Sequence, residues 1–128
     1  PSEFLEFDDW PPPDVSERAL FVRSPCPPGG RLGALGTMPP SSGQGGLLRY
    51  TYDPRNPTTY AGAGWLNMRK DGPRSQRDVE MRSDVLVLTS EPFEHSFDVV
   101  GNVRATLFMR CSAPECDVVA RLCVVRKP

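Results

Sequence analysis

The sequence lacks the residues expected of a complete catalytic triad and the long apolar run of a membrane-spanning helix. It holds one histidine, His95, and no serine lies in the Gly-x-Ser-x-Gly pattern of the strained turn that exposes a nucleophile. No apolar run approaches the roughly 18 residues of a membrane helix. We therefore expect no complete Ser-His-Asp triad within these residues and no membrane partner, and we interpret His95 as an exposed turn histidine.

Clustered charge and metal-ligand spacing are also missing. The net charge is -1 and no run of Lys and Arg forms a stripe for phosphates, so a nucleic-acid partner is not indicated. The glycine-rich segment at residues 41–46, SSGQGG, lacks the Gly-Lys-Ser/Thr ending of a phosphate-binding loop. No Cys-x-x-Cys pair is present. We expect neither a cofactor nor a metal. The sequence does not determine localisation, and a cytoplasmic one is the default expectation.

Proline and glycine are abundant instead. There are 15 prolines in 128 residues, where average composition gives about 5%, and 11 glycines accompany them. Both residue types interrupt helices and mark turns. Since clear apolar runs lie between these turns, the composition favours an all-β domain with many loops over a disordered tail.

Strand-like segments lie between the turns. Residues 97–111 alternate, with Val103, Ala105, Leu107 and Met109 on the face expected to meet a core. No comparable stretch holds the 3.6-residue apolar period of a helix. We expect six or seven short antiparallel strands in a sandwich or jelly roll, with candidates at residues 19–22, 31–35, 47–54, 83–90, 97–111 and 117–125.

Four cysteines, Cys26, Cys111, Cys116 and Cys123, permit disulfides without establishing them. Cys111 and Cys116 flank the turn-like Ser-Ala-Pro-Glu and could face each other across a hairpin. The alternative is that most of the four are small buried apolar side chains.

Charge is densest in Gly72–Phe93, GPRSQRDVEMRSDVLVLTSEPF, directly before an apolar strand candidate. Arginines and carboxylates alternate there, and a carboxylate beside a guanidinium is a poor general acid. Arginine also makes fork-shaped hydrogen bonds to carboxylates and carbonyls. We expect Arg77 and Arg82 to anchor the long connection of residues 58–83. The alternative is a solvated charged loop.

The same segment resembles the G-P-x-D-Q-R-x-V-E-x-R-x-D-V-L-x-x-T-S-x-P-L element of the cocaine esterase-like and Xaa-Pro dipeptidyl-peptidase family of serine hydrolases. The element belongs to the C-terminal β-sandwich of that family. Three further matches follow the family's order: DDWPPP at residues 8–13, YTYDPRNPTT at residues 50–59, and the alternating pattern of residues 97–125. The sequence departs from the family pattern at Ser75, at Cys116–Val118 and at residues 56–59.

The resemblance implies a fold and a division of labour. The fold is an antiparallel jelly-roll β-sandwich, galactose-binding-like and incomplete at its C-terminal end, over residues 19–128, with residues 1–18 as an extended lead-in segment. In the family the Ser-Asp-His triad lies on an upstream α/β-hydrolase domain, and the sandwich packs on that domain and helps shape the active-site mouth. The parent would act on acyl esters, amides or Xaa-Pro peptides, while this segment alone would not be catalytic. The alternative is a free-standing jelly-roll module that binds carbohydrate or protein.

Two groups of residues carry the expected roles. Residues 60–72 would face the catalytic domain, with Trp65, Leu66 and Met68 either forming a wall of the substrate pocket or packing between domains. The structural motif residues implied by the resemblance are Trp10, Tyr52, Asp53, Gln76, Arg77, Arg82 and Asp84.

Overall fold

The computed structural model describes residues 6–23, 32–41, 47–62 and 72–125. It divides into two units: residues 18–95 form one, and residues 1–17 together with residues 96–128 form the other. Within the described residues, no helix is long and apolar enough to cross a bilayer.

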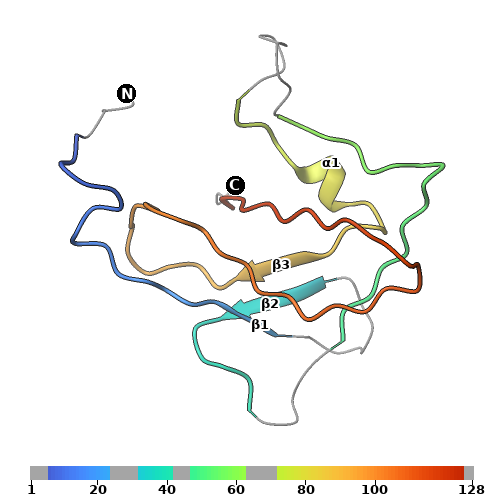
Figure 1. Cartoon of the computed structure of the whole chain (residues 1–128), viewed down its shortest axis with the longest axis horizontal. Coiled ribbons are helices and arrows are strands. Elements are labelled where there is room, and N and C mark those ends of the chain that lie inside the picture. Colours follow the sequence, from blue (N-terminus) through green and yellow to red (C-terminus); the bar gives the residue numbers. More distant parts are fainter. Residues whose placement is uncertain (1–5, 24–31, 42–46, 63–71, 126–128) are drawn as a thin grey trace. The chain divides into compact units, whose positions relative to one another are not determined.

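The unit of residues 18–95 is built on one three-stranded sheet with the order β1-β2-β3 (Figure 1). The strands are β1 at Phe21–Arg23, β2 at Leu32–Gly36 and β3 at Val87–Ser90. Each lies in or overlaps a segment predicted as a strand from its apolar pattern. Regular structure in the described residues is therefore mainly β-sheet, as expected for an all-β protein.

The direction of one pairing differs from the prediction. β1 and β2 are antiparallel, with Phe21 opposite Gly36. β2 and β3 are parallel, with Leu32 opposite Val87 and Leu35 opposite Ser90. Parallel neighbours need a long crossover, and residues 37–86 supply one. Periodicity reports which residues share a face, and it carries no information on the direction of the neighbouring strand.

The sheet packs closely at Gly33 in β2. A Cβ atom at this position would lie 2.5 Å from Leu88 Cδ2 and 3.2 Å from Leu48 Cδ1. Leu88 belongs to the adjacent strand, whereas Leu48 comes from the connection after β2. Glycine at residue 33 thus lets two leucine side chains approach the middle of the sheet.

Two side-chain contacts involve residues in or next to the strands of the sheet. The Arg23 Nη2 atom donates a hydrogen bond of 2.8 Å to the carbonyl oxygen of Met38. The Arg18 guanidinium carbon lies 5.5 Å from the ring centroid of Phe93, within the range of a cation–π interaction. The second contact joins the residues just before β1 to those just after β3.

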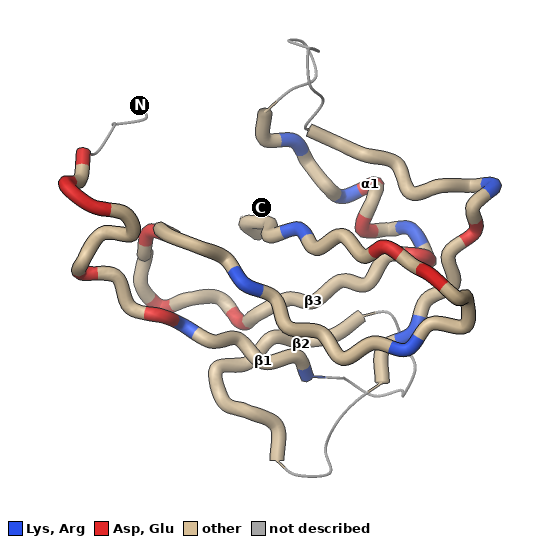
Figure 2. Tube along the Cα trace, viewed as in Figure 1, with Lys and Arg blue, Asp and Glu red and all other residues tan. Residues whose placement is uncertain are grey.

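A single helical turn, α1 at Arg77–Glu80, precedes β3. The Glu80 amide donates to the Gln76 carbonyl at 2.9 Å, and the Met81 amide donates to the Arg77 carbonyl at 3.0 Å. No helix was predicted here, because one turn is too short to show a 3.6-residue period. The turn places charged residues of both signs close together before β3 (Figure 2).

The other unit joins the acidic N-terminal segment to the C-terminal third of the chain. The Trp10–Pro11 peptide bond is cis, and the Val15 amide donates to the Pro12 carbonyl at 3.3 Å. Gly101 has a φ of 100°, and a Cβ atom there would lie 3.5 Å from Pro11 Cβ. The lead-in segment therefore touches the start of the alternating segment.

The alternating residues 97–111 form no regular strand, and none is assigned in the described residues beyond Ser90. The side chains of Val103, Leu107 and Met109 are 67%, 48% and 52% exposed. Their expected burial against a second sheet is thus not found among the described residues. Alternation predicts a face suited to burial, and burial itself needs a layer that covers the face. Residues 47–54, also predicted as a strand, form no regular strand either.

The cysteine interpretation is corrected in the same region. Cys111, Cys116 and Cys123 are free thiols and exposed, so they are not buried apolar side chains. Cys26 lies outside the described residues.

Candidate functional site

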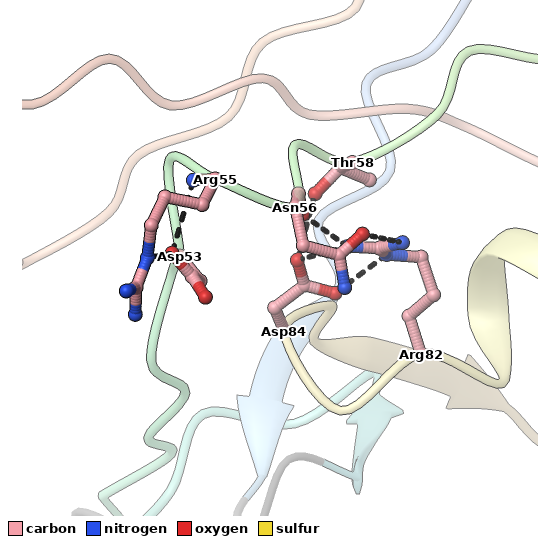
Figure 3. A network of polar contacts seen from close by, with 6 residues as sticks. All are labelled: Asp53, Arg55, Asn56, Thr58, Arg82 and Asp84. Carbon is pink, nitrogen blue, oxygen red and sulfur yellow. Dashed lines mark hydrogen bonds and ion pairs between the residues drawn. The ribbon is translucent and has the colours of Figure 1, made fainter.

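The clearest polar site centres on Arg82 and Asp84, just before β3 (Figure 3). Arg82 Nε donates to Asp84 Oδ1 at 2.8 Å, and Arg82 Nη2 donates to Asp84 Oδ2 at 2.7 Å. This bidentate arrangement is the strong form of an arginine–carboxylate pair. The two side chains are 20% and 8% exposed, so the pair is largely withdrawn from water.

The same pair reaches a turn that is distant in the sequence. Arg82 Nη2 also donates to the Asn56 carbonyl at 2.7 Å, and Nη1 lies 3.4 Å from Asn56 Oδ1. The Thr58 hydroxyl donates to Asp84 Oδ2 at 3.1 Å. Each contact spans 26 positions of sequence. We call Asn56, Thr58, Arg82 and Asp84 the anchor network.

The turn is held in shape by Asp53. Its carbonyl accepts the Asn56 amide at 3.0 Å, and its Oδ1 accepts the Arg55 amide at 3.0 Å. Aspartate at the first position and proline at the second are favoured in such turns, because the carboxylate bonds the backbone and proline presets φ. The turn therefore presents the Asn56 carbonyl at a defined place for Arg82.

A second contact closes the chain just beyond the turn. Gln76 Nε2 donates to the Ala61 carbonyl at 3.0 Å and to the Arg74 carbonyl at 3.1 Å. Gly62 has a φ of 92°, and a Cβ atom there would lie 2.8 Å from the Gly72 carbonyl oxygen. The chain before residue 63 and the chain after residue 71 are thus in direct contact. We call Ala61, Gly62, Gly72 and Gln76 the loop base.

The anchor network stays charged at neutral pH. Hydrogen bonds from Arg82 lower the pKa of the Asp84 carboxyl below its usual 3.8, burial acts in the opposite direction, and the Thr58 hydroxyl adds to the lowering. The hydrogen bond to Asp84 likewise raises the pKa of Arg82. A carboxyl held ionised in this way cannot act as a general acid. The pair is suited to holding two segments together.

An open depression of about 300 Å³ lies over the network. Its donors and acceptors largely bond to one another, which leaves few groups to direct at a ligand. In the described residues, no group of three His, Cys, Asp or Glu side chains is placed to hold a metal ion. The depression is lined by Thr51, Asp53, Asn56, Arg82, Ser83 and Asp84.

The structure brings three of the expected motif residues, Gln76, Arg82 and Asp84, into the loop base and the anchor network. A fourth, Asp53, shapes the turn that carries Asn56. Arg77 is different: it is the first residue of α1, and its guanidinium has no hydrogen bond or ion pair with the part of the chain that is described. Among the described residues, Arg82 makes the side-chain anchor, and anchoring by Arg77 stays a prediction.

The other expected motif residues, Trp10 and Tyr52, are exposed. Trp10 belongs to the other unit, and Tyr52 directly precedes Asp53. His95 is exposed, as expected. Trp65, Leu66 and Met68 lie outside the described residues, so their place on a pocket wall or between domains stays a prediction.

The hydrogen-bond partners of Arg82, Asp84 and Gln76 were not predicted from the sequence. Asn56 and Thr58 supply a carbonyl, an amide oxygen and a hydroxyl, and the Ala61 carbonyl receives Gln76. A backbone carbonyl has no signature in a sequence. The Asp-Pro-x-Asn turn was the one available signal, since it marks where the chain presents free carbonyls.

Comparison with known proteins assigns the family. The model of the X-Pro dipeptidyl-peptidase C-terminal non-catalytic domain matches residues 2–127. The chain belongs to this family. The cocaine esterase of Rhodococcus sp. (strain MB1 Bresler) is 33% identical to this X-Pro dipeptidyl-peptidase C-terminal domain over 122 residues, which is 94% of the chain. The chain spans 21% of that relative's length. No solved structure gives a significant match.

Proposed function

We propose that this domain is the non-catalytic C-terminal part of a serine hydrolase whose α/β-hydrolase domain carries the Ser-Asp-His triad. The observation that carries the proposal is the family itself, which is described as non-catalytic. The esterase relative is also much longer than this domain. The parent would hydrolyse acyl esters, amides or Xaa-Pro peptides.

The domain packs on the catalytic domain, and the exposed alternating face supports this part of the proposal. Val103, Leu107 and Met109 share one face of an extended segment, and each is about half exposed or more. Contiguous apolar surface of this kind is unfavourable in water and is typical of an interaction surface. In the parent, the catalytic domain would cover this face.

The loop base and the anchor network hold both ends of residues 63–71. Gln76 and Gly62 join the two ends directly. Arg82 fixes the turn that carries Asn56, which precedes both ends in the chain. The flanking residues are already held in place and need no ordering when a partner binds, which lowers the entropic cost of contact. This supports a role for Trp65, Leu66 and Met68 at the mouth of the parent's active site.

The first test is the coding sequence upstream of Pro1. A hydrolase domain with a Gly-x-Ser-x-Gly turn is expected there. A reading frame without one would overturn the proposal in favour of a free-standing binding module. Such a module would present aromatics along one strand face. The exposed tyrosines of this chain, Tyr50, Tyr52 and Tyr60, lie outside β1–β3.

The second test concerns packing in the whole parent protein. Leu107→Ala is expected to cost about 2–5 kcal/mol of stability, the usual range for a buried leucine. Thr106→Ala, on the opposite face, is the matched control and should cost far less. Equal losses in thermal melts of the two variants would show that the Leu107 face is not covered in the parent.

A further inference from the structure

A groove of about 400 Å³ lies in the unit that joins the N-terminal segment to the C-terminal third of the chain. The Val15 amide donates to the Pro12 carbonyl at 3.3 Å and closes the bend at its wall. Phe7 and Val15 are 49% and 41% exposed, so much of the apolar surface of the groove is open to water. This apolar surface comes from Phe7, Pro12, Pro13, Val15 and Val100.

The rim of the groove is acidic throughout. Glu6, Asp8, Asp9 and Asp14 line it, and no Lys or Arg does. Residues 1–17 contain no Lys or Arg at all, and Figure 2 shows carboxylates without a basic residue along the described part of this segment. Among the described residues, none of the four carboxylates has an ion pair with a basic side chain. Like charges around one groove repel one another, and a cation placed among them would relieve that repulsion.

Lysine and arginine side chains match both features of the groove. Each buries its aliphatic stem along an apolar surface while its charged end stays at the rim, within reach of carboxylates. An acidic segment would be repelled, and a purely apolar segment would leave the carboxylates without a counter-charge. Charge complementarity therefore favours a basic segment as the occupant.

We propose, on the basis of the function proposed above, that this groove takes a basic segment of the parent's catalytic domain. That domain precedes residues 6–15 in the same chain, and the tether presents its surface at a high effective concentration. The groove is a second contact, distinct from the apolar face of Val103, Leu107 and Met109. Its charge would fix how the two domains meet, because complementary charges suppress wrong arrangements.

Hydrogen–deuterium exchange of the whole parent protein tests this contact. Asp8→Asn combined with Asp14→Asn removes two charges from the rim. Glu17→Gln combined with Asp98→Asn is the matched control, because it removes two exposed charges of the same unit that lie outside the groove. In the rim variant, exchange should rise about 2- to 30-fold, the range for two lost surface ion pairs, at residues 6–15 and at one Lys- or Arg-bearing segment of the catalytic domain. The control should exchange like the wild type.

Salt provides a second measurement that needs no substitution. At about 1 M salt the screening length falls to about 3 Å, so exchange in the wild type should rise at the same two segments. No change at any segment outside these 128 residues would overturn the proposal, as would a responding segment without Lys or Arg. Loss of the coupling on dilution would also overturn it, since a second copy of the protein would then fill the groove. With a hydrolase domain present in the parent, each of these results leaves the proposed function standing, whereas a parent without that domain refutes the proposed function itself.

Discussion

The loop base makes a quantitative prediction through its two glycines. Gly62 and Gly72 both have positive φ, 92° and 88°, so alanine at either position is strained by about 1–2 kcal/mol. Only Gly62 is also crowded. A Cβ atom there would lie 2.8 Å from the Gly72 carbonyl oxygen and 2.9 Å from Arg74 Cβ, whereas a Cβ at Gly72 meets nothing within 4 Å.

The two substitutions therefore separate backbone strain from crowding. Overpacking against a fixed backbone atom costs about 1–3 kcal/mol. Gly62→Ala should lose about 2–5 kcal/mol, and Gly72→Ala about 1–2 kcal/mol. The measurement is urea unfolding of the whole protein by circular dichroism, with stabilities compared at matching m-values. Equal losses from the two variants would show that the two ends of the loop are not in contact and would refute the loop base.

Three further predictions test other parts of the arrangement. Gln76→Ala removes two neutral hydrogen bonds and should cost about 1–3 kcal/mol in the same unfolding assay, where an unchanged midpoint would contradict the contact with Ala61. Because the folded pKa of Asp84 is lowered, its stabilisation is present above pH 3.8 and is lost as the pH falls through the folded pKa; Asp84→Asn should flatten the decline in stability below pH 3.8, and an identical slope would count against the pair. Gly33→Val should destabilise by about 1–3 kcal/mol in thermal melts, while Ala34→Val on the exposed face of β2 should be near neutral; similar losses would contradict the close approach of Leu88 to Gly33.

The fold could be predicted where the signal is local. The apolar runs at residues 19–22, 31–35 and 83–90 locate β1, β2 and β3 to within a few residues, because a strand's side-chain period lies in its own sequence. The parallel pairing of β2 and β3 depends on the path of residues 37–86, and no local pattern records that path. The alternation of residues 97–111 was a similar case, because burial depends on a covering layer that the alternation itself does not encode.

The candidate site was predictable in part for the same reason. Charge alternation before β3 and the Asp-Pro turn at Asp53 pointed to a polar anchor between distant segments. The partner of Arg82 is a backbone carbonyl at Asn56, which any residue could present. The sequence therefore does not distinguish Arg82 from Arg74 and Arg77 as the arginine that bonds to Asn56. In the structure, Arg82 reaches the Asn56 turn because it lies just after α1.

We propose that the domain serves a serine hydrolase without supplying its nucleophile. A fluorophosphonate probe, which labels the activated serine of such enzymes, tests this on the whole parent protein. The labelled protein is digested and the modified serine is located by mass spectrometry. We expect a single labelled serine in a Gly-x-Ser-x-Gly turn outside these 128 residues. Label on a serine within them, lost when His95 is replaced by alanine, would contradict this proposal.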